Sequence, residues 1–152
     1  MEKISLHGAG SQNNMFGRSA DKKSMYVSSN KRNPKFFDLW KLDTAGWAPS
    51  LLYQNDSGYS PGVISKTERY FTLVKDVTTD KNELYLYDRN TKGMKRLSNN
   101  NEATWYPAVF EKNDSILYYI TNDGSDFSYL VKYNIKSDKS EKLFETTWDV
   151  VI

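Results

Sequence analysis

The sequence predicts an all-β protein built from one repeated four-stranded unit. Three observations lead to this prediction: a period of 45–46 residues along the chain, short segments of alternating character, and a high content of aromatic residues. The 152 residues include 11 Tyr, 7 Phe and 4 Trp, which suit half-buried pleated surfaces and so favour strands. A helical repeat would need apolar residues three and four positions apart, and that spacing is missing.

The period is visible in four separate series of residues. Each series recurs every 45 or 46 residues, and agreement among four series makes chance an unsatisfactory explanation. The series are Leu39, Leu84 and Leu130; Leu6, Leu52, Leu97 and Leu143; Met25, Tyr70 and Ile116; and Pro61 with Pro107.

Each repeat contains four short strands separated by turns rich in Asn, Asp, Gly and Lys. Four strands in about 45 residues are typical of one blade of a β-propeller. The sequence therefore predicts a partial β-propeller of about three four-stranded antiparallel blades, packed face to face. The strands expected most clearly lie near residues 24–29, 37–43, 69–75, 83–88, 115–121 and 128–134.

The phase of the repeat predicts that the chain begins and ends inside repeats. Closed propellers have about four to eight blades, so about three blades suggest an excerpt of a larger ring. The expected organisation is 1–13 as the last strand of a preceding blade with its loop, blades at 14–55, 56–101 and 102–146, and 147–152 as the beginning of a next blade.

Composition excludes several classes of partner. The formal net charge is only +2, which predicts no strong attraction to nucleic acid or to an anionic membrane. No apolar stretch approaches the roughly 20 residues needed to span a bilayer. The absence of cysteine excludes disulfides and thiolate metal sites; it favours a cytoplasmic location and leaves a periplasmic one open.

One stretch resembles a blade of the propellers found in prolyl-oligopeptidase-type serine peptidases. In that family a Ser-Pro-Asp-Gly turn precedes an apolar strand and a Ser-Asn-Arg segment, and residues 16–33 are similar to this pattern. Phe37-Asp38-Leu39-Trp40 looks like the Phe-Asp-Leu-Tyr that follows, and residues 83–88 with Arg96-Leu97-Ser98 look like the next blade. The terminal Trp148-Asp149-Val150 is similar to a Trp-Asp-Val that recurs in the family.

The chain also departs from the family pattern. Ala20 stands in place of the Pro and Lys22 in place of the Gly, and the equivalent turns at 65–68 and 111–114 have lost the pattern. Blades of this kind also occur in Tol-system propellers. The resemblance therefore leaves the subfamily open.

The resemblance implies a non-catalytic role for this chain. In the family a separate α/β-hydrolase domain carries the catalytic residues, and the propeller covers the active site and filters peptide substrates. The expected partners are thus a peptide substrate, reached through the parent enzyme, and the hydrolase domain, no part of which is visible in this sequence. The alternative is a free-standing Tol-like propeller that binds a protein or a saccharide at its central opening.

Gly58-Tyr59-Ser60-Pro61-Gly62 matches the Gly-x-Ser-x-Gly of hydrolase nucleophile elbows, but three arguments oppose catalysis at Ser60. The oxyanion hole uses the N–H of the residue after the nucleophile, and Pro61 has none. The segment lies at a junction between repeats, without a strand–turn–helix context. The only histidine, His7, precedes Ser60, whereas this fold orders its triad Ser, Asp, His. We expect a turn here, and no catalytic residue in the chain.

No cofactor or metal site is expected either. Gly8-Ala9-Gly10 lacks a following helix and is expected to be a loop after the Leu6 strand. Residues 122–126 (Asn-Asp-Gly-Ser-Asp) lack the glutamate of a calcium-binding EF-hand loop and predict a hairpin turn. The Asn-x-Ser sequons at Asn55 and Asn113 are also expected to be turns. Trp40, Tyr85, Tyr87 and Tyr118 could stack nucleic-acid bases, but their repeat phase favours packing between blades.

Self-association is the last expectation from the repeat. A blade buries both faces against its neighbours, so about three blades leave an apolar face bare at each end. We expect these faces and the terminal strands to drive dimerisation, swapping or aggregation.

Overall fold

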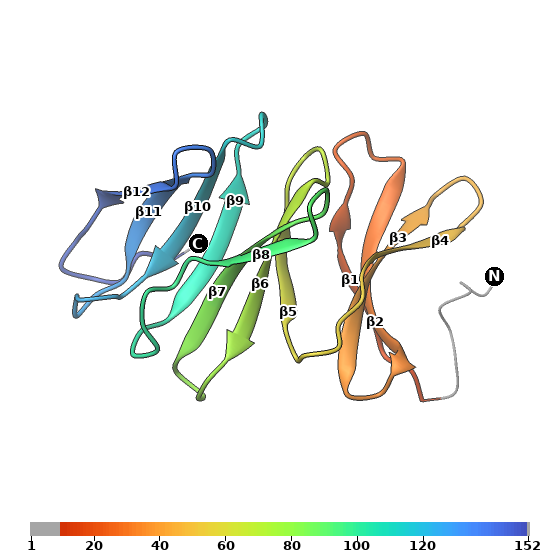
Figure 1. Cartoon of the computed structure of the whole chain (residues 1–152), viewed down its shortest axis with the longest axis horizontal. Helices are drawn as coiled ribbons and strands as arrows, with labels where there is room; N and C mark the ends of the chain where they lie inside the picture. The colour runs from red at the N-terminus through yellow and green to blue at the C-terminus, as the bar shows by residue number, and fades with distance from the viewer. Residues whose placement is uncertain (1–9, 152) are drawn as a thin grey trace. The chain divides into compact units, whose positions relative to one another are not determined.

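The computed structural model describes residues 10–151 and contains only β-strands and the turns between them. The described strands form three four-stranded antiparallel sheets in which strands adjacent in sequence are neighbours in space (Figure 1). This confirms the predicted all-β class and the partial propeller of three four-stranded blades. Residues 10–151 include no helix that is long and apolar enough to span a membrane.

The first sheet has the order β1-β2-β3-β4, with β1 at Asn13–Arg18, β2 at Ser24–Asn33, β3 at Phe36–Asp43 and β4 at Pro49–Tyr53. Register is set by pairs such as Val27 with Trp40. On one face Val27 and Leu42 form a small buried cluster, against which Trp40 and Trp47 pack.

The second sheet has the order β5-β6-β7-β8, with β5 at Ser60–Ile64, β6 at Tyr70–Asp76, β7 at Asn82–Asp88 and β8 at Gly93–Arg96. The third sheet is β9-β10-β11-β12, with β9 at Trp105–Phe110, β10 at Ile116–Thr121, β11 at Tyr129–Asn134 and β12 at Lys139–Phe144. All six strands that were expected most clearly are present. The largest difference is at β2, which continues to Asn33 because it forms a long hairpin with β3.

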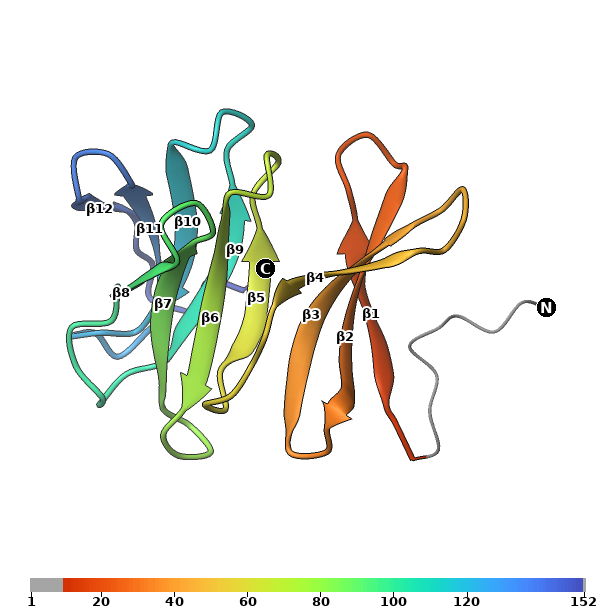
Figure 2. The same cartoon turned by 45° about the vertical axis from the view of Figure 1, so that its right-hand side comes forward.

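The chain divides into two compact units, Met1–Ser60 and Pro61–Ile152. The first unit holds the sheet β1–β4, and the second holds the other two sheets (Figure 2). In the second unit these two sheets pack face to face, as expected. Their shared core joins residues of β7 to residues of β9, β10 and β11 and to Ala103 in the segment before β9. Its buried members are Leu84, Leu86, Ala103, Trp105, Phe110, Leu117, Tyr119, Val131 and Tyr133.

The turns before β2, β6 and β10 have one geometry although their sequences differ. The fourth residue of each turn donates its N–H to the carbonyl of the first residue, at 3.0 Å in all three turns. These fourth residues, Lys22, Glu68 and Asp114, have φ values of 62, 63 and 57°. A left-handed residue favours glycine, which is the residue the family pattern has at this position. The backbone therefore retains a turn that the side chains no longer signal.

Candidate functional site

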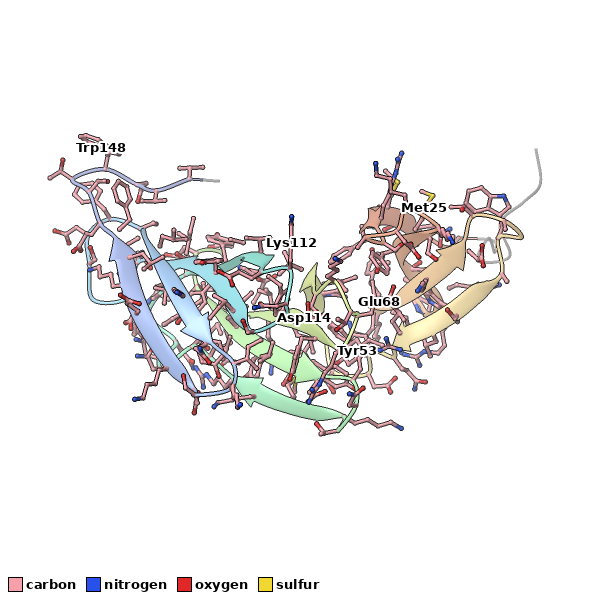
Figure 3. All side chains as sticks on the ribbon, turned by 90° about the horizontal axis from the view of Figure 1, so that it is seen from above. Met25, Tyr53, Glu68, Lys112, Asp114 and Trp148 are labelled. Carbon is pink, nitrogen blue, oxygen red and sulfur yellow. The ribbon has the colours of Figure 1, made fainter. Side chains whose placement is uncertain are left out.

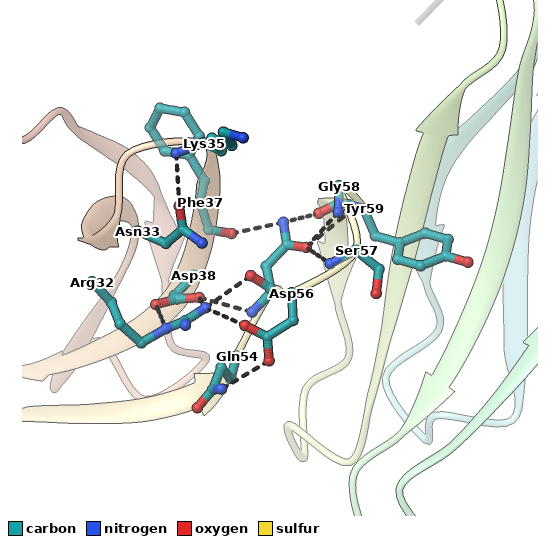
Figure 4. A network of polar contacts seen from close by, with 11 residues as sticks. Arg32, Asn33, Lys35, Phe37, Asp38, Gln54, Asp56, Ser57, Gly58 and Tyr59 are labelled. Carbon is teal, nitrogen blue, oxygen red and sulfur yellow. Dashed lines mark hydrogen bonds and ion pairs between the residues drawn. The ribbon is translucent and has the colours of Figure 1, made fainter.

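A network of charged and amide groups connects the β2–β3 hairpin of the first unit to the segment after β4 (Figure 4). Arg32, near the end of β2, donates from Nε and Nη2 to the two carboxylate oxygens of Asp38 in β3, at 2.8 and 2.9 Å. Nη2 also lies 2.9 Å from a carboxylate oxygen of Asp56. The Asp38 side chain is fully buried, and its hydrogen bond raises the pKa of Arg32 above the usual range. A buried carboxylate needs such a partner, because an unpaired charge costs several kcal/mol.

Asn55 completes this network. Its backbone N–H donates to Asp38 at 2.7 Å, and its side-chain oxygen accepts the N–H groups of residues 57, 58 and 59 at 3.1–3.3 Å. Its side-chain nitrogen donates to the carbonyl of Phe37 at 3.2 Å. Asn55 is 3% exposed, so its sequon is not accessible to a glycan, whereas the sequon residue Asn113 is exposed. The polar groups of this network form hydrogen bonds with one another. Its role is therefore structural, because it fixes the β2–β3 hairpin to the segment after β4.

The repeat position of Asp38 is occupied by different residues in the two sheets of the second unit. Glu83, equivalent to Asp38, lies 3.3 Å from Arg96 on β8 and accepts a hydrogen bond from Tyr85 at 2.6 Å. In the third sheet the equivalent residue is Tyr129, whose ring has the Lys142 ammonium 3.9 Å from its centroid. The position is thus acidic twice and aromatic once, with a cation beside it each time.

The segment 58–62 does not form a nucleophile elbow. Ser60 is exposed and is the first residue of β5, so the expectation of a turn at this residue was wrong. Residues 60–64 form the edge strand of the second sheet, and the chain bends earlier, at residues 56 and 57. Beyond Pro61, Gly62 lies so close to β6 and β9 that a Cβ would be 2.7 Å from the Pro107 side chain. The close approach of the second and third sheets therefore explains why residue 62 is glycine.

The other sequence candidates have structural roles or lie outside the described residues. Residues 122–126 connect β10 to β11 as the expected hairpin, with Gly124 at φ 67°. His7 and residues 8 and 9 lie outside the described residues. Residues 10–151 contain no group of three or more His, Asp or Glu arranged to hold a metal ion. In the segment 147–151 the structure has no strand; Asp149 accepts the N–H of Ser128, and Val150 donates to the Ser128 carbonyl.

The aromatic residues singled out in the sequence pack within the protein. The Tyr87 ring lies 4.7 Å from that of Phe71, and the hydroxyls of Tyr85 and Tyr118 donate to Glu83 and Glu111. The hydrogen bond to Glu111 is the largest cause of a raised pKa at Tyr118. Trp40 packs against the Val27–Leu42 cluster. They form no exposed stack of the kind that binds bases.

The contact that sequence reasoning missed lies between two turns of the second unit. Asp114, 7% exposed, accepts the backbone N–H groups of Lys66 and Thr67 at 3.1 and 3.2 Å, and also the Thr67 hydroxyl. Figure 3 labels Asp114 beside the turn of the second sheet that ends at Glu68. A carboxylate on the third sheet therefore holds the turn of the second sheet. One feature of the sequence could have indicated this contact. Asp114 stands where the family pattern has glycine, 46 residues after Glu68, in a turn that has lost the rest of that pattern.

Comparison with solved structures places the chain among β-propellers. It is similar to TolB from Acinetobacter baumannii, with 12% identity and a TM-score of 0.63 over 90% of this chain and 34% of that one. It is also similar to prolyl oligopeptidase B from Galerina marginata (15%, 0.59, over 85% of this chain and 20% of that one). A third similar structure is the oligogalacturonate lyase of Vibrio parahaemolyticus (18%, 0.59, over 90% and 42%). No family model and no curated protein sequence matches the chain.

At these identities the likeness establishes the fold. The chain spans less than half the length of each of these three proteins. TolB-like and prolyl oligopeptidase structures both occur among the similar structures. The partial propeller fold is therefore compatible with both interpretations of the sequence, the peptidase propeller and the Tol-like propeller.

Proposed function

We propose that this chain is a non-catalytic propeller segment of a prolyl-oligopeptidase-like serine peptidase, in which the propeller gates or filters peptide substrates for a hydrolase domain. The observation that carries the proposal is the contact between Arg32 and Asp38. These residues belong to the two segments that resemble the peptidase blade. They form a bidentate ion pair in which the Asp38 carboxylate is fully buried. The resemblance therefore lies in residues that interact, and prolyl oligopeptidase structures are among the neighbours.

The second candidate is a free-standing Tol-like propeller that binds a protein or a saccharide. It is favoured by a specific observation: TolB structures align with a TM-score of 0.63 over 88–90% of this chain. The two candidates share the fold and differ in one chemical property of the parent protein. A peptidase carries an activated serine, and a binding propeller does not.

The experiment is to label an extract of the source cells with a fluorophosphonate probe and to recover the protein that carries this segment with an antibody against residues 10–151. The peptidase predicts a labelled protein roughly 400 residues longer than this chain. An unlabelled parent protein would contradict the peptidase and favour the Tol-like module. The isolated chain and its Ser60→Ala variant are matched controls, and both are expected to remain unlabelled.

A further inference from the structure

The third sheet repeats, on its outer face, the apolar surface that the second sheet buries. In the second sheet Val63, Val74 and Leu84 belong to the core shared with the third sheet. Their equivalents, 46 residues later in each case, are Val109, Ile120 and Leu130, which are all apolar.

Strand register places these equivalents on the face of the third sheet that points away from the second. Ile120 pairs with Tyr106 and with Leu130, and Tyr118 pairs with Val109, whereas the alternate residues Leu117 and Tyr119 belong to the shared core. On this outer face Tyr106 is 55% and Val109 54% exposed. Ile120, in the middle of this face, is only 4% exposed. The face is therefore built like a blade interface, and among the described residues its β9 side is the exposed part.

The turn beside this face offers the same hydrogen-bond donors as the turn that Asp114 holds. In the second sheet the second and third residues of the turn, Lys66 and Thr67, donate their N–H groups to Asp114. In the third sheet these positions are Lys112 and Asn113. The two residues are exposed, and within residues 10–151 their backbone N–H groups have no hydrogen-bond acceptor. Paired N–H groups of one turn make a site for an anion.

We propose that the N–H groups of Lys112 and Asn113 bind one carboxylate, supplied by an Asp or Glu at the fourth turn position of a further propeller blade that covers the outer face of the third sheet. The carboxylate would sit as Asp114 sits on the turn of the second sheet. The fourth residue of such a turn has a positive φ, and Asp is among the residues that tolerate it. The inference rests on the fold and does not depend on whether the parent protein is a peptidase.

A second copy of this chain is a poorer occupant of the same place. Its first blade presents Lys22 at the fourth turn position. An ammonium group has no acceptor and would face two N–H donors, so a copy stacked head to tail would lack the carboxylate contact. The site thus discriminates between a blade with an acidic turn and the first blade of another copy.

The test extends the chain after Thr146 with a second copy of residues 102–146, so that the appended blade carries the equivalent of Asp114. A matched chain has Asp→Ala at that appended position, and a third has Asp→Lys to imitate the turn of the first blade. Amide hydrogen exchange of Lys112 and Asn113 is measured by NMR in all three chains and in the original one.

We expect these two amides to exchange at least tenfold more slowly in the extended chain with Asp, because a charge-assisted hydrogen bond protects them. The Ala and Lys variants are expected to return them to the rate of the original chain. Equal rates with Asp and Ala would overturn the proposal, whether both are fast or both are slow, because slow exchange in both would mean protection by burial alone.

Discussion

Two equivalent faces of the second unit differ in how far their apolar residues are buried. The face of the second sheet around Leu84 is buried, with Leu84 fully inaccessible to solvent, and Asp114 of the third sheet holds the adjacent turn. The outer face of the third sheet has apolar residues at the same positions; Ile120 is 4% exposed there, whereas Tyr106 and Val109 are more than half exposed. The repeat thus places apolar residues on both faces, and the β9 side of the outer face is the part that the described sheets leave exposed.

The largest effect is expected from truncating matched leucines on the two faces. Leu84→Ala should lower the free energy of unfolding of the second unit by about 3–4 kcal/mol, because it leaves a cavity in a packed core. Leu130→Ala, at the equivalent half-buried position, should cost about 1 kcal/mol. Urea denaturation followed by circular dichroism measures both. Equal losses would mean that the two faces are packed alike, against our description.

High pH should unfold the second unit through tyrosines of the covered interface. Burial raises the pKa of Tyr119 to about 12, and burial with a hydrogen bond to Asp138 also raises that of Tyr133. A raised pKa means that the folded state favours the protonated phenol. The stability it contributes is therefore complete below about pH 10 and is lost as pH rises to about 12, amounting to about 3 kcal/mol for Tyr119.

Absorbance at the tyrosinate band, recorded together with circular dichroism, measures this transition. We expect cooperative ionisation of buried tyrosines together with loss of strand signal, and Tyr119→Phe should move the midpoint to higher pH. Ionisation of all tyrosines near pH 10 with the fold intact would contradict the burial of this interface.

The sequence predicted the sheets and their face-to-face packing, but not the polar contacts within and between them. The strand positions could be predicted because apolar and aromatic residues recur at a fixed period. This pattern can be recognised in a single sequence. Asp38 and Glu83 share a repeat position, yet their cations come from different places, Arg32 on the hairpin and Arg96 on the outer strand. Asp114 was overlooked because two of its three partners are backbone N–H groups 47 and 48 residues away, which no side-chain pattern encodes.

A smaller effect is expected where the two sheets approach most closely. Gly62→Ala should destabilise the second unit by about 2 kcal/mol, because its Cβ would meet Thr72 and would lie 2.7 Å from Pro107. Gly46→Ala is the matched control, since a Cβ there meets no heavy atom within 4 Å. Thermal unfolding of both variants checks this. A neutral Gly62→Ala variant would show that β5 and β9 are farther apart than described.

The smallest effect on stability is expected from the contact between the turns. Asp114→Ala removes the acceptor of two backbone N–H groups and of the Thr67 hydroxyl, and should cost about 1–2 kcal/mol. Lys22→Ala is a suitable control, because Lys22 is an exposed fourth turn residue in the first unit. Chemical denaturation of the two variants compares them. A loss no larger than that of Lys22→Ala would mean that the carboxylate contributes nothing to the interface.

The most direct test of the account is amide hydrogen exchange at the two turns in the unmodified chain. Lys66 and Thr67 are held by Asp114, whereas Lys112 and Asn113 have the same turn geometry without an acceptor among the described residues. We predict exchange at least tenfold slower for Lys66 and Thr67 than for Lys112 and Asn113, with the difference abolished by Asp114→Ala. Equal exchange at the two turns in the unmodified chain would contradict the account.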